Sequence, residues 1–303
     1  MSGLPQRRMR RCEPGDHDRL ARADHDPPCG AAHARLRTKE HSVGQTSVNR
    51  EDALDRSRSA LRAVTFDFWS TLVDGAATPE RTALRVARLQ ATIVGGGFAC
   101  SPDQVLHAFE VMTERFDAPL PDSVEDIGPP ARWAAVAREL GIPEGLIPYA
   151  VVERAYEDLT LNPPPPTMPH VEVAVAAARQ AGYRLGVICN TGMAGGRVLR
   201  QVLSRHALLD AFDVTVFSDE FGAAKPHPSI FLHALAELGG VAPDAALHVG
   251  DVEGLDVSGA RGAGMHAALY APDPSAEPST HADFVVRDWR EFGSQLRRFV
   301  MPG

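Results

Sequence analysis

Short apolar runs that alternate with segments of helical periodicity dominate residues 62–290 of this 303-residue chain. The first run, Ala63-Val64-Thr65-Phe66, ends at Asp67. Similar runs follow at 185–189, 214–217, 246–249, 266–270 and 284–286. Helical patterns lie between them near 171–181, 195–205, 228–238 and 256–263. Runs of this length predict buried strands, and their alternation with helices predicts an α/β fold with a doubly wound, parallel, Rossmann-like sheet.

The stretch from 76 to 165 interrupts this alternation. It contains helical patterns, and no convincing strand, at 79–94, 102–116, 130–140 and 144–160. It ends in four consecutive prolines, 163–166, which predict a stiff, extended linker. We therefore expect an α-helical cap domain at 76–165, inserted into a core made of 59–75 and 166–303. A domain inserted beside strand ends is well placed to act as a lid.

Residues 1–58 are polar and show no apolar periodicity, so they are predicted to be a disordered N-terminal extension. Arginines at 7, 8, 10 and 11 suggest an export signal, but no apolar stretch follows them. No run of eighteen apolar residues exists to predict a membrane span. We therefore expect a cytoplasmic protein without a membrane partner.

Charge and cysteine usage narrow the possible functions. The net charge is −8, and because residues 1–60 carry twelve basic and nine acidic residues, the remainder carries −11. Such an acidic body does not predict a nucleic-acid partner. The four cysteines (12, 29, 100 and 189) form no Cys-x-x-Cys pair, which argues against a disulfide framework or a zinc site. Lys39 and Lys225 are the only lysines among 31 basic residues, so Lys225 is a candidate functional residue.

Polar residues follow three of the predicted strands. Asp67, the Cys189-Asn190-Thr191 segment and Asp251 each stand where a strand is expected to end. Ligands of open parallel sheets bind beyond the carboxyl ends of the strands. These residues are therefore expected to meet at one site.

Four segments, taken in order, resemble the motifs of the haloacid dehalogenase-like superfamily. Phe66–Leu72 resembles its Asp-x-Asp-x-Thr motif, and Val187–Gly192 resembles a strand that ends in Ser or Thr. Phe221–Pro228 is similar to the Lys-Pro-x-Pro element, and Val249–Asp256 is similar to Gly-Asp-x-x-x-x-Asp. Together they cover nearly all of residues 62–290. The predicted helical insertion matches the subgroup whose cap follows the first motif.

The resemblance implies roles for these residues. Asp67 would be a carboxylate nucleophile that forms a covalent intermediate. Asp67, Asp251 and the backbone carbonyl of Trp69 would bind Mg²⁺, which prefers oxygen ligands, and Asp256 would hold a metal-bound water. Lys225 would offset the charge of the carboxylates and of a substrate phosphate.

The remaining site residues would contact substrate. Thr71 is expected either to reach the transferred group through its hydroxyl or to cap a turn. Cys189, Asn190, Thr191 and the side chain of Trp69 are the expected substrate-binding residues. Only general chemistry and the resemblance support these roles.

Two departures from the family pattern affect the expected chemistry. Phosphatases of the family carry a second aspartate two residues after the nucleophile, as general acid and base, where this chain has Trp69. Indole cannot exchange that proton, so poor leaving groups would react ~10²–10⁴-fold more slowly. Aryl and acyl phosphates, which need little protonation, would be affected less. Cys189 replaces a Ser or Thr that binds phosphate, and a thiol is a weak donor.

We therefore expect a Mg²⁺-dependent hydrolase that acts on a phosphoric ester or anhydride of a small metabolite through an aspartyl-phosphate. A 2-haloacid dehalogenase is one alternative, since those relatives also carry an aromatic residue at the position of Trp69. They typically lack the Gly-Asp-x-x-x-x-Asp motif, and the arginine they place some thirty residues after the nucleophile is missing near Phe98. A weakly active or binding protein is another alternative. A phosphonate hydrolase is excluded because the insertion has no lysine.

Overall fold

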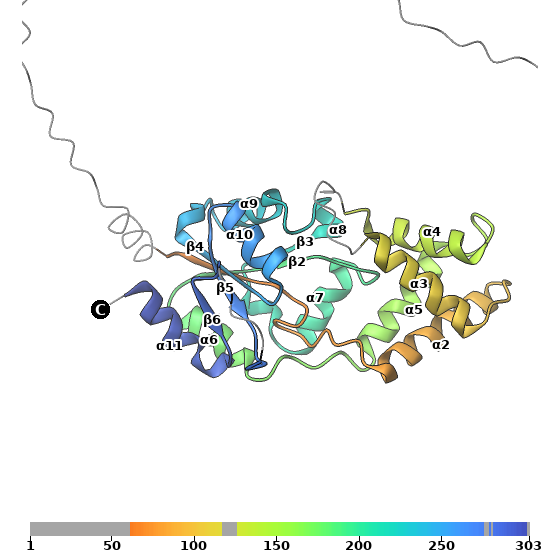
Figure 1. Cartoon of the computed structure of the whole chain (residues 1–303), viewed down its shortest axis with the longest axis horizontal. Coiled ribbons are helices and arrows are strands. Elements are labelled where there is room, and N and C mark those ends of the chain that lie inside the picture. The colour runs from red at the N-terminus through yellow and green to blue at the C-terminus, as the bar shows by residue number, and fades with distance from the viewer. Residues whose placement is uncertain (1–60, 117–125, 276–278, 280, 302–303) are drawn as a thin grey trace, which may run out of the picture. The chain divides into compact units, whose positions relative to one another are not determined.

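The computed structural model describes residues 61–116, 126–275, 279 and 281–301. The predicted disorder of 1–58 lies outside these residues. Within them, six parallel strands form one sheet in the order β3-β2-β1-β4-β5-β6 (Figure 1). The strands are β1 (Ala63–Phe66), β2 (Arg184–Cys189), β3 (Val214–Phe217), β4 (Ala246–Gly250), β5 (His266–Tyr270) and β6 (Phe284–Val286). The predicted parallel, doubly wound sheet is confirmed.

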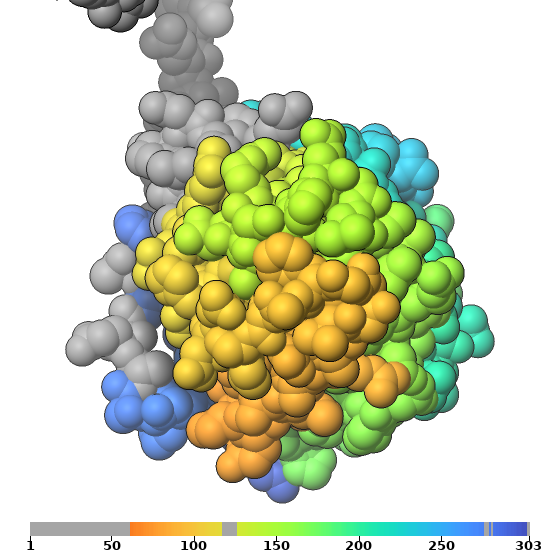
Figure 2. Space-filling model, turned by 90° about the vertical axis from the view of Figure 1, so that its right-hand side faces the viewer, coloured from red at the N-terminus to blue at the C-terminus, as the bar shows by residue number. Residues whose placement is uncertain are grey.

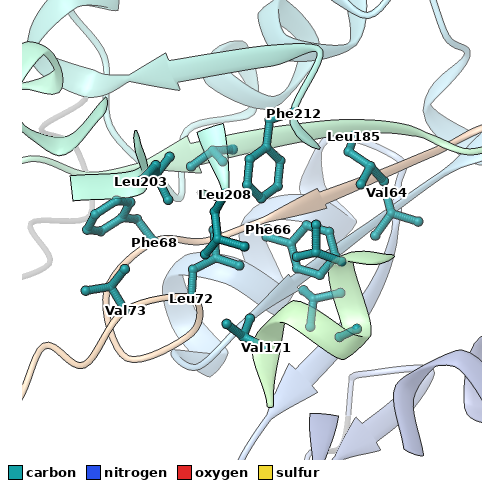
Figure 3. Close-up of a cluster of buried hydrophobic side chains, with 14 of the residues drawn as sticks. Val64, Phe66, Phe68, Leu72, Val73, Val171, Leu185, Leu203, Leu208 and Phe212 are labelled. Carbon is teal, nitrogen blue, oxygen red and sulfur yellow. The ribbon is translucent and has the colours of Figure 1, made fainter. Parts of the chain in front are cut away.

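Helices cover both faces of the sheet. Side chains alternate along each strand, so each face has an apolar surface that the helices bury. Val64 and Phe66 of β1 pack into a cluster with helices α6 (Val171–Gln180), α7 (Gly196–Arg205) and α11 (Trp289–Val300) (Figure 3). Ala63 of the same strand packs into a second cluster with α9 (Pro228–Glu237) and α10 (Ser258–Gly262). The remaining short helical segments of the core are η1 (Leu209–Ala211), α8 (Ser218–Phe221), η2 (Pro243–Ala245) and η3 (Glu253–Val257), the last a π-helical turn.

Between β1 and β2 the chain forms a group of helices with its own apolar cluster. They are α2 (Pro79–Gly95), α3 (Pro102–Phe116), α4 (Gly128–Leu140) and α5 (Tyr149–Leu161), here called the helical insertion. Leu89, Ile93, Val105, Trp133 and Val152 are buried where these helices meet. The insertion covers the face of the molecule that Figure 2 shows, with α2 in orange and α3 in yellow. It therefore packs around a core separate from those of the sheet.

The two connections to the helical insertion run side by side. Val73 forms an antiparallel bridge with Thr167. The backbone amide of Asp74 donates to the carbonyl of Pro166 at 2.8 Å, and that of Met168 donates to Leu72 at 2.9 Å. The chain thus leaves and re-enters the core at one place. No helix among the described residues is long and apolar enough to span a bilayer.

Candidate active site

The strand order changes direction between β1 and β4, which are neighbours in the sheet. The chain moves outward from β1 to β2 and β3, then returns to add β4 on the other side of β1. Asp67 follows β1 directly, and Asp251 follows β4. The amide of Asp67 donates to Val249 of β4 at 2.8 Å, which holds the two strand ends together. Ligands of open α/β sheets bind at such a switch point.

Lys225 lies between two buried carboxylates at this point. Its Nζ atom donates to Oδ1 of Asp67 and, at 2.7 Å, to Oδ1 of Asp256. Lys225 is 4% exposed, Asp67 6% and Asp256 1%. A buried cation of this kind is stable only beside negative charge, which these two carboxylates provide. The scarcity of lysine in the sequence thus coincides with an internal charged cluster.

Further donors hold Asp256 in place. Its Oδ2 accepts from the amide of Val252 at 2.9 Å, and Nε2 of His248 lies 3.2 Å from Oδ1. On the other side of the ring, Nδ1 of His248 lies 2.9 Å from the hydroxyl of Thr65. Burial lowers the pKa of His248, so the neutral ring donates from Nε2 to Asp256 and accepts from Thr65. Nothing in the sequence predicts this contact of His248.

Gly250 leaves the space that Asp256 occupies. A Cβ atom on Gly250 would lie 2.2 Å from Cγ of Asp256, far inside van der Waals contact. The π-helical turn η3 brings the Asp256 carboxylate back against the end of β4. The Gly-Asp pair of the sequence motif therefore has a steric reason for its glycine.

The two carboxylates that share Lys225 differ in pKa. Burial raises the pKa of Asp67 to about 7, against the attraction of Lys225, and the charges of Asp256 and Asp251 raise it further. Burial also acts to raise the pKa of Asp256, but Lys225 and His248 outweigh it and hold that pKa below its ordinary range. Burial acts to lower the pKa of Lys225, and the two carboxylates reverse this. Lys225 is thus charged. Its charge does not offset the effect of burial on Asp67, so the pKa of Asp67 stays above its ordinary value.

A third carboxylate, Asp251, completes the cluster. The hydroxyl of Thr71 donates to Oδ1 of Asp251 at 3.4 Å, so Thr71 joins the site through this contact. Burial and the charge of Asp256 raise the pKa of Asp251 to about 6. Oxygen atoms from Asp67, Asp251 and Asp256 lie within 4.8 Å of one another. Three clustered carboxylates with one lysine fit a divalent cation with a preference for oxygen ligands.

The segment after β2 is also brought to the site, with different roles for its side chains. Asn190 accepts from the amide of Lys225 at 2.7 Å and donates to its carbonyl at 2.9 Å, so its side chain holds the lysine backbone. Cys189 is fully buried, and burial raises the pKa of its thiol well above the ordinary value. The amide of Thr191 donates to the hydroxyl of Ser218 at 2.8 Å. The Asn190 side chain is therefore engaged with the protein, and Thr191 is bound to Ser218 through its backbone.

A buried polar contact joins the helical insertion to this segment. The carboxylate of Asp126 accepts from the hydroxyl of Ser218 and, at 3.4 Å, from that of Thr191. It also lies 3.9 Å from the guanidinium of Arg132, and both side chains are less than a tenth exposed. Asp126 has no recognisable sequence signal, because it stands in an insertion without motifs.

A cavity of about 440 Å³ lies between the helical insertion and the loops that follow Asp67 and Thr191. Trp69 lines it and packs edge-on against Phe68 with ring centroids 4.8 Å apart. Most of the remaining wall is apolar and comes from Leu84, Phe109, Met112, Leu159 and the prolines at 163–166. Trp69, two residues after Asp67, thus contributes its indole to a largely apolar chamber, whose described lining does not include Asp67, Asp251, Asp256 or Lys225.

Comparisons with known proteins agree with this architecture. A family model described as haloacid dehalogenase-like hydrolase matches residues 61–264. The chain therefore belongs to the haloacid dehalogenase-like hydrolase family, as its four motifs predicted.

Similar proteins include both phosphatases and dehalogenases. Haloacid dehalogenase-like hydrolase domain-containing protein 3 of Mus musculus is 32% identical over 151 residues, 50% of this chain and 56% of its own length. A phosphoserine phosphatase of Thermus thermophilus is 37% identical over 131 residues, 42% of this chain and 49% of its own length. The chain thus spans about half the length of these relatives. The solved 2-haloacid dehalogenase of Pseudomonas syringae is 22% identical with a TM-score of 0.60, covers 79% of this chain and 99% of its own, and supports the fold alone.

Proposed function

We propose that this protein hydrolyses phosphoric esters or anhydrides of small molecules with Mg²⁺, and that aryl or acyl phosphates are its best substrates. The observation that carries the proposal is the buried Lys225 between Asp67 and Asp256, with Asp251 close by. The phosphatases among the relatives support the reaction class. Trp69 at the position of the usual general acid supports the restriction to easy leaving groups.

In the proposed reaction, an oxygen of Asp67 attacks phosphorus, and the bond to the leaving oxygen breaks with its electron pair. Lys225 stabilises the negative charge that develops on the phosphoryl group, while Asn190 holds the lysine backbone in place. Water then attacks the phosphorus of the aspartyl-phosphate, releases phosphate and restores Asp67. Mg²⁺ held by Asp67, Asp251 and the Trp69 carbonyl would supply positive charge that keeps these carboxylates ionised. Asp256 orients Lys225, and it would hold a water bound to that ion.

We also propose that residues 76–165 act as a cap over a core of 59–75 and 166–303. The cavity that the insertion shares with the Asp67 loop supports this division. Closure of such a lid would exclude water from the carboxylate cluster.

Hydrolysis of p-nitrophenyl phosphate and acetyl phosphate, with Mg²⁺ or with EDTA, tests the proposal. Release of phosphate that needs the metal and is lost in Asp67→Asn is the expected result. Chloride release from 2-chloropropionate that EDTA leaves unchanged would instead identify a dehalogenase. Absence of both products would contradict hydrolysis and favour a binding role.

A further inference from the structure

Three arginines line the cavity, and two of them are already paired. Arg81 lies 3.3 Å from the carboxylate of Asp74. Arg132 lies 3.9 Å from Asp126. Arg85, an exposed residue of α2 that lines the same cavity, has no ion-pair or hydrogen-bond partner in the part of the chain that the structure describes. One positive charge in the cavity wall is thus available to a ligand.

Tyr156 of α5 supplies a second group without a partner. It lines the same cavity and is only 7% exposed, and its ring packs against Phe109 with centroids 6.1 Å apart. Its hydroxyl has no hydrogen-bond partner among the described residues and is not one of their buried, unpaired polar atoms, so it is open to the cavity. Burial raises the pKa of Tyr156, so the phenol remains a donor, and the charge of Arg85 opposes that increase. Arg85 of α2 and Tyr156 of α5 thus line one cavity from two different helices.

We propose that Arg85 and Tyr156 form a subsite for a carboxylate on the leaving-group part of the substrate. The inference rests on the proposed function, because the subsite belongs to the same cavity as Trp69. A carboxylate accepts hydrogen bonds from both a guanidinium and a phenol. Its single charge matches one unpaired arginine, whereas a second phosphate would need another cation, and Arg81 and Arg132 are already paired.

The rest of the cavity wall indicates the chemistry of the part of the substrate that joins its phosphate to its carboxylate. Leu84, Phe109, Met112 and Leu159 give it an apolar lining, to which Trp69 also belongs. Burial of an apolar body against these side chains is favourable. The substrate class is therefore a phosphate ester whose apolar, preferably aromatic, leaving group carries a carboxylate at its far end.

The test compares two ligands that are not hydrolysed, 4-carboxybenzylphosphonate and its neutral isostere 4-carbamoylbenzylphosphonate. Calorimetry with the full chain and Mg²⁺ gives the ratio of their dissociation constants. We expect the wild type to prefer the carboxylate by about tenfold, which is the effect of a charge-assisted hydrogen bond in a half-open site. Arg85→Gln should abolish the preference, and Tyr156→Phe should reduce it about threefold.

Arg88 provides the matched control. It lies one turn further along α2, outside the cavity wall, and pairs with Asp158. Arg88→Gln should keep the tenfold preference, and thermal unfolding should show that each variant is folded. A preference that survives in Arg85→Gln would overturn the subsite, as would a wild type that binds both ligands equally or binds neither.

A separate readout tests the reaction itself. Phosphate release from p-nitrophenyl phosphate, which has no carboxylate, reports on the proposed hydrolysis alone. Absence of the binding preference in the wild type, with hydrolysis intact, would contradict only the subsite. A clear preference without any hydrolysis would contradict only the reaction.

Discussion

At the scale of single residues, two buried carboxylates, Asp67 and Asp256, share the positive charge of Lys225. Asp256 also accepts hydrogen bonds from His248 and from the Val252 amide, whereas Asp67 lacks these two donors. Asp256 therefore stays ionised, and the pKa of Asp67 rises instead. A buried carboxylate held in this way ionises more readily when further positive charge is present.

The raised pKa of Asp67 predicts a pH effect on stability. Between the unfolded value of 3.8 and about 7, the folded state binds more protons than the unfolded state. The free energy of unfolding contributed by Asp67 therefore falls as pH rises through this window. In EDTA, the melting temperature of wild type relative to Asp67→Asn should fall between pH 5 and pH 8. The comparison cancels the opposite slope from His248, whose pKa is lowered. A constant difference would contradict the raised pKa.

Restoring the general acid should change which leaving groups react. Trp69→Asp places a carboxylate two residues after the nucleophile, and it should accelerate hydrolysis of glycerol phosphate by ~10²-fold. Acetyl phosphate, whose leaving group needs no proton, should change far less. Steady-state kinetics measure both, and Trp69→Asn controls for loss of the indole. An equal effect of the two substitutions would show that protonation is not the missing step.

At the scale of elements, the turn from β4 into η3 joins fold and site. Gly250 and Asp256 approach so closely that no side chain fits between them, although they are six residues apart. A π-helical turn is uncommon and is often found at functional sites. Any side-chain atom added at Gly250 would clash with Asp256 and displace its carboxylate from Lys225.

Gly250→Ala should therefore impair both stability and activity. The new methyl group would displace Asp256, with an expected cost of about 1–3 kcal/mol in the free energy of unfolding. Gly254→Ala, in the same turn, is the matched control, because its Cβ would meet nothing within 4 Å. The control should stay within about 0.5 kcal/mol of wild type. Urea unfolding measures both, and an unaffected Gly250→Ala would argue against the steric account.

At the scale of the whole molecule, polar contacts of two kinds tie the helical insertion to the core. One is the buried contact of Asp126 with Ser218, Thr191 and Arg132. The other is on the surface, where Arg197 of α7 pairs with Glu157 of α5 at 2.8 Å. Buried and exposed contacts of this kind differ in energy, because water competes for the exposed pair.

Asp126→Ala should cost about 1–3 kcal/mol in the free energy of unfolding, because it leaves buried donors without their acceptor. Glu157→Ala should cost no more than about 1 kcal/mol, since its partner Arg197 is more than half exposed. Chemical denaturation of the two variants side by side makes the comparison. Equal costs would mean that the buried contact does not hold the insertion to the core.

Much of this architecture could be predicted, since apolar runs such as Ala63–Phe66 indicate the strands and the motifs follow those strands in order. The family followed from the same motifs. The roles of His248 and Asp126 could not be predicted. His248 contacts Thr65, and Asp126 contacts Ser218, and both partners are distant in sequence. Arg81, Arg85 and Arg132 could not be predicted as cavity residues either, because they come together from two helices, α2 and α4, that are distant in sequence.

The paired connections at Val73 and Thr167 have a consequence for evolution and design. The chain leaves and re-enters the core through two neighbouring segments, at Val73 and Thr167. The residues between these two positions therefore form an insertion that could be replaced or removed. Exchange of that segment between relatives should change the cavity wall and leave the buried carboxylates of the core in place. Joining 74 to 166 by a short turn should therefore leave a shortened chain that unfolds cooperatively, as thermal circular dichroism would show. Such modularity would let one ancestral core acquire new chemistry by insertion alone.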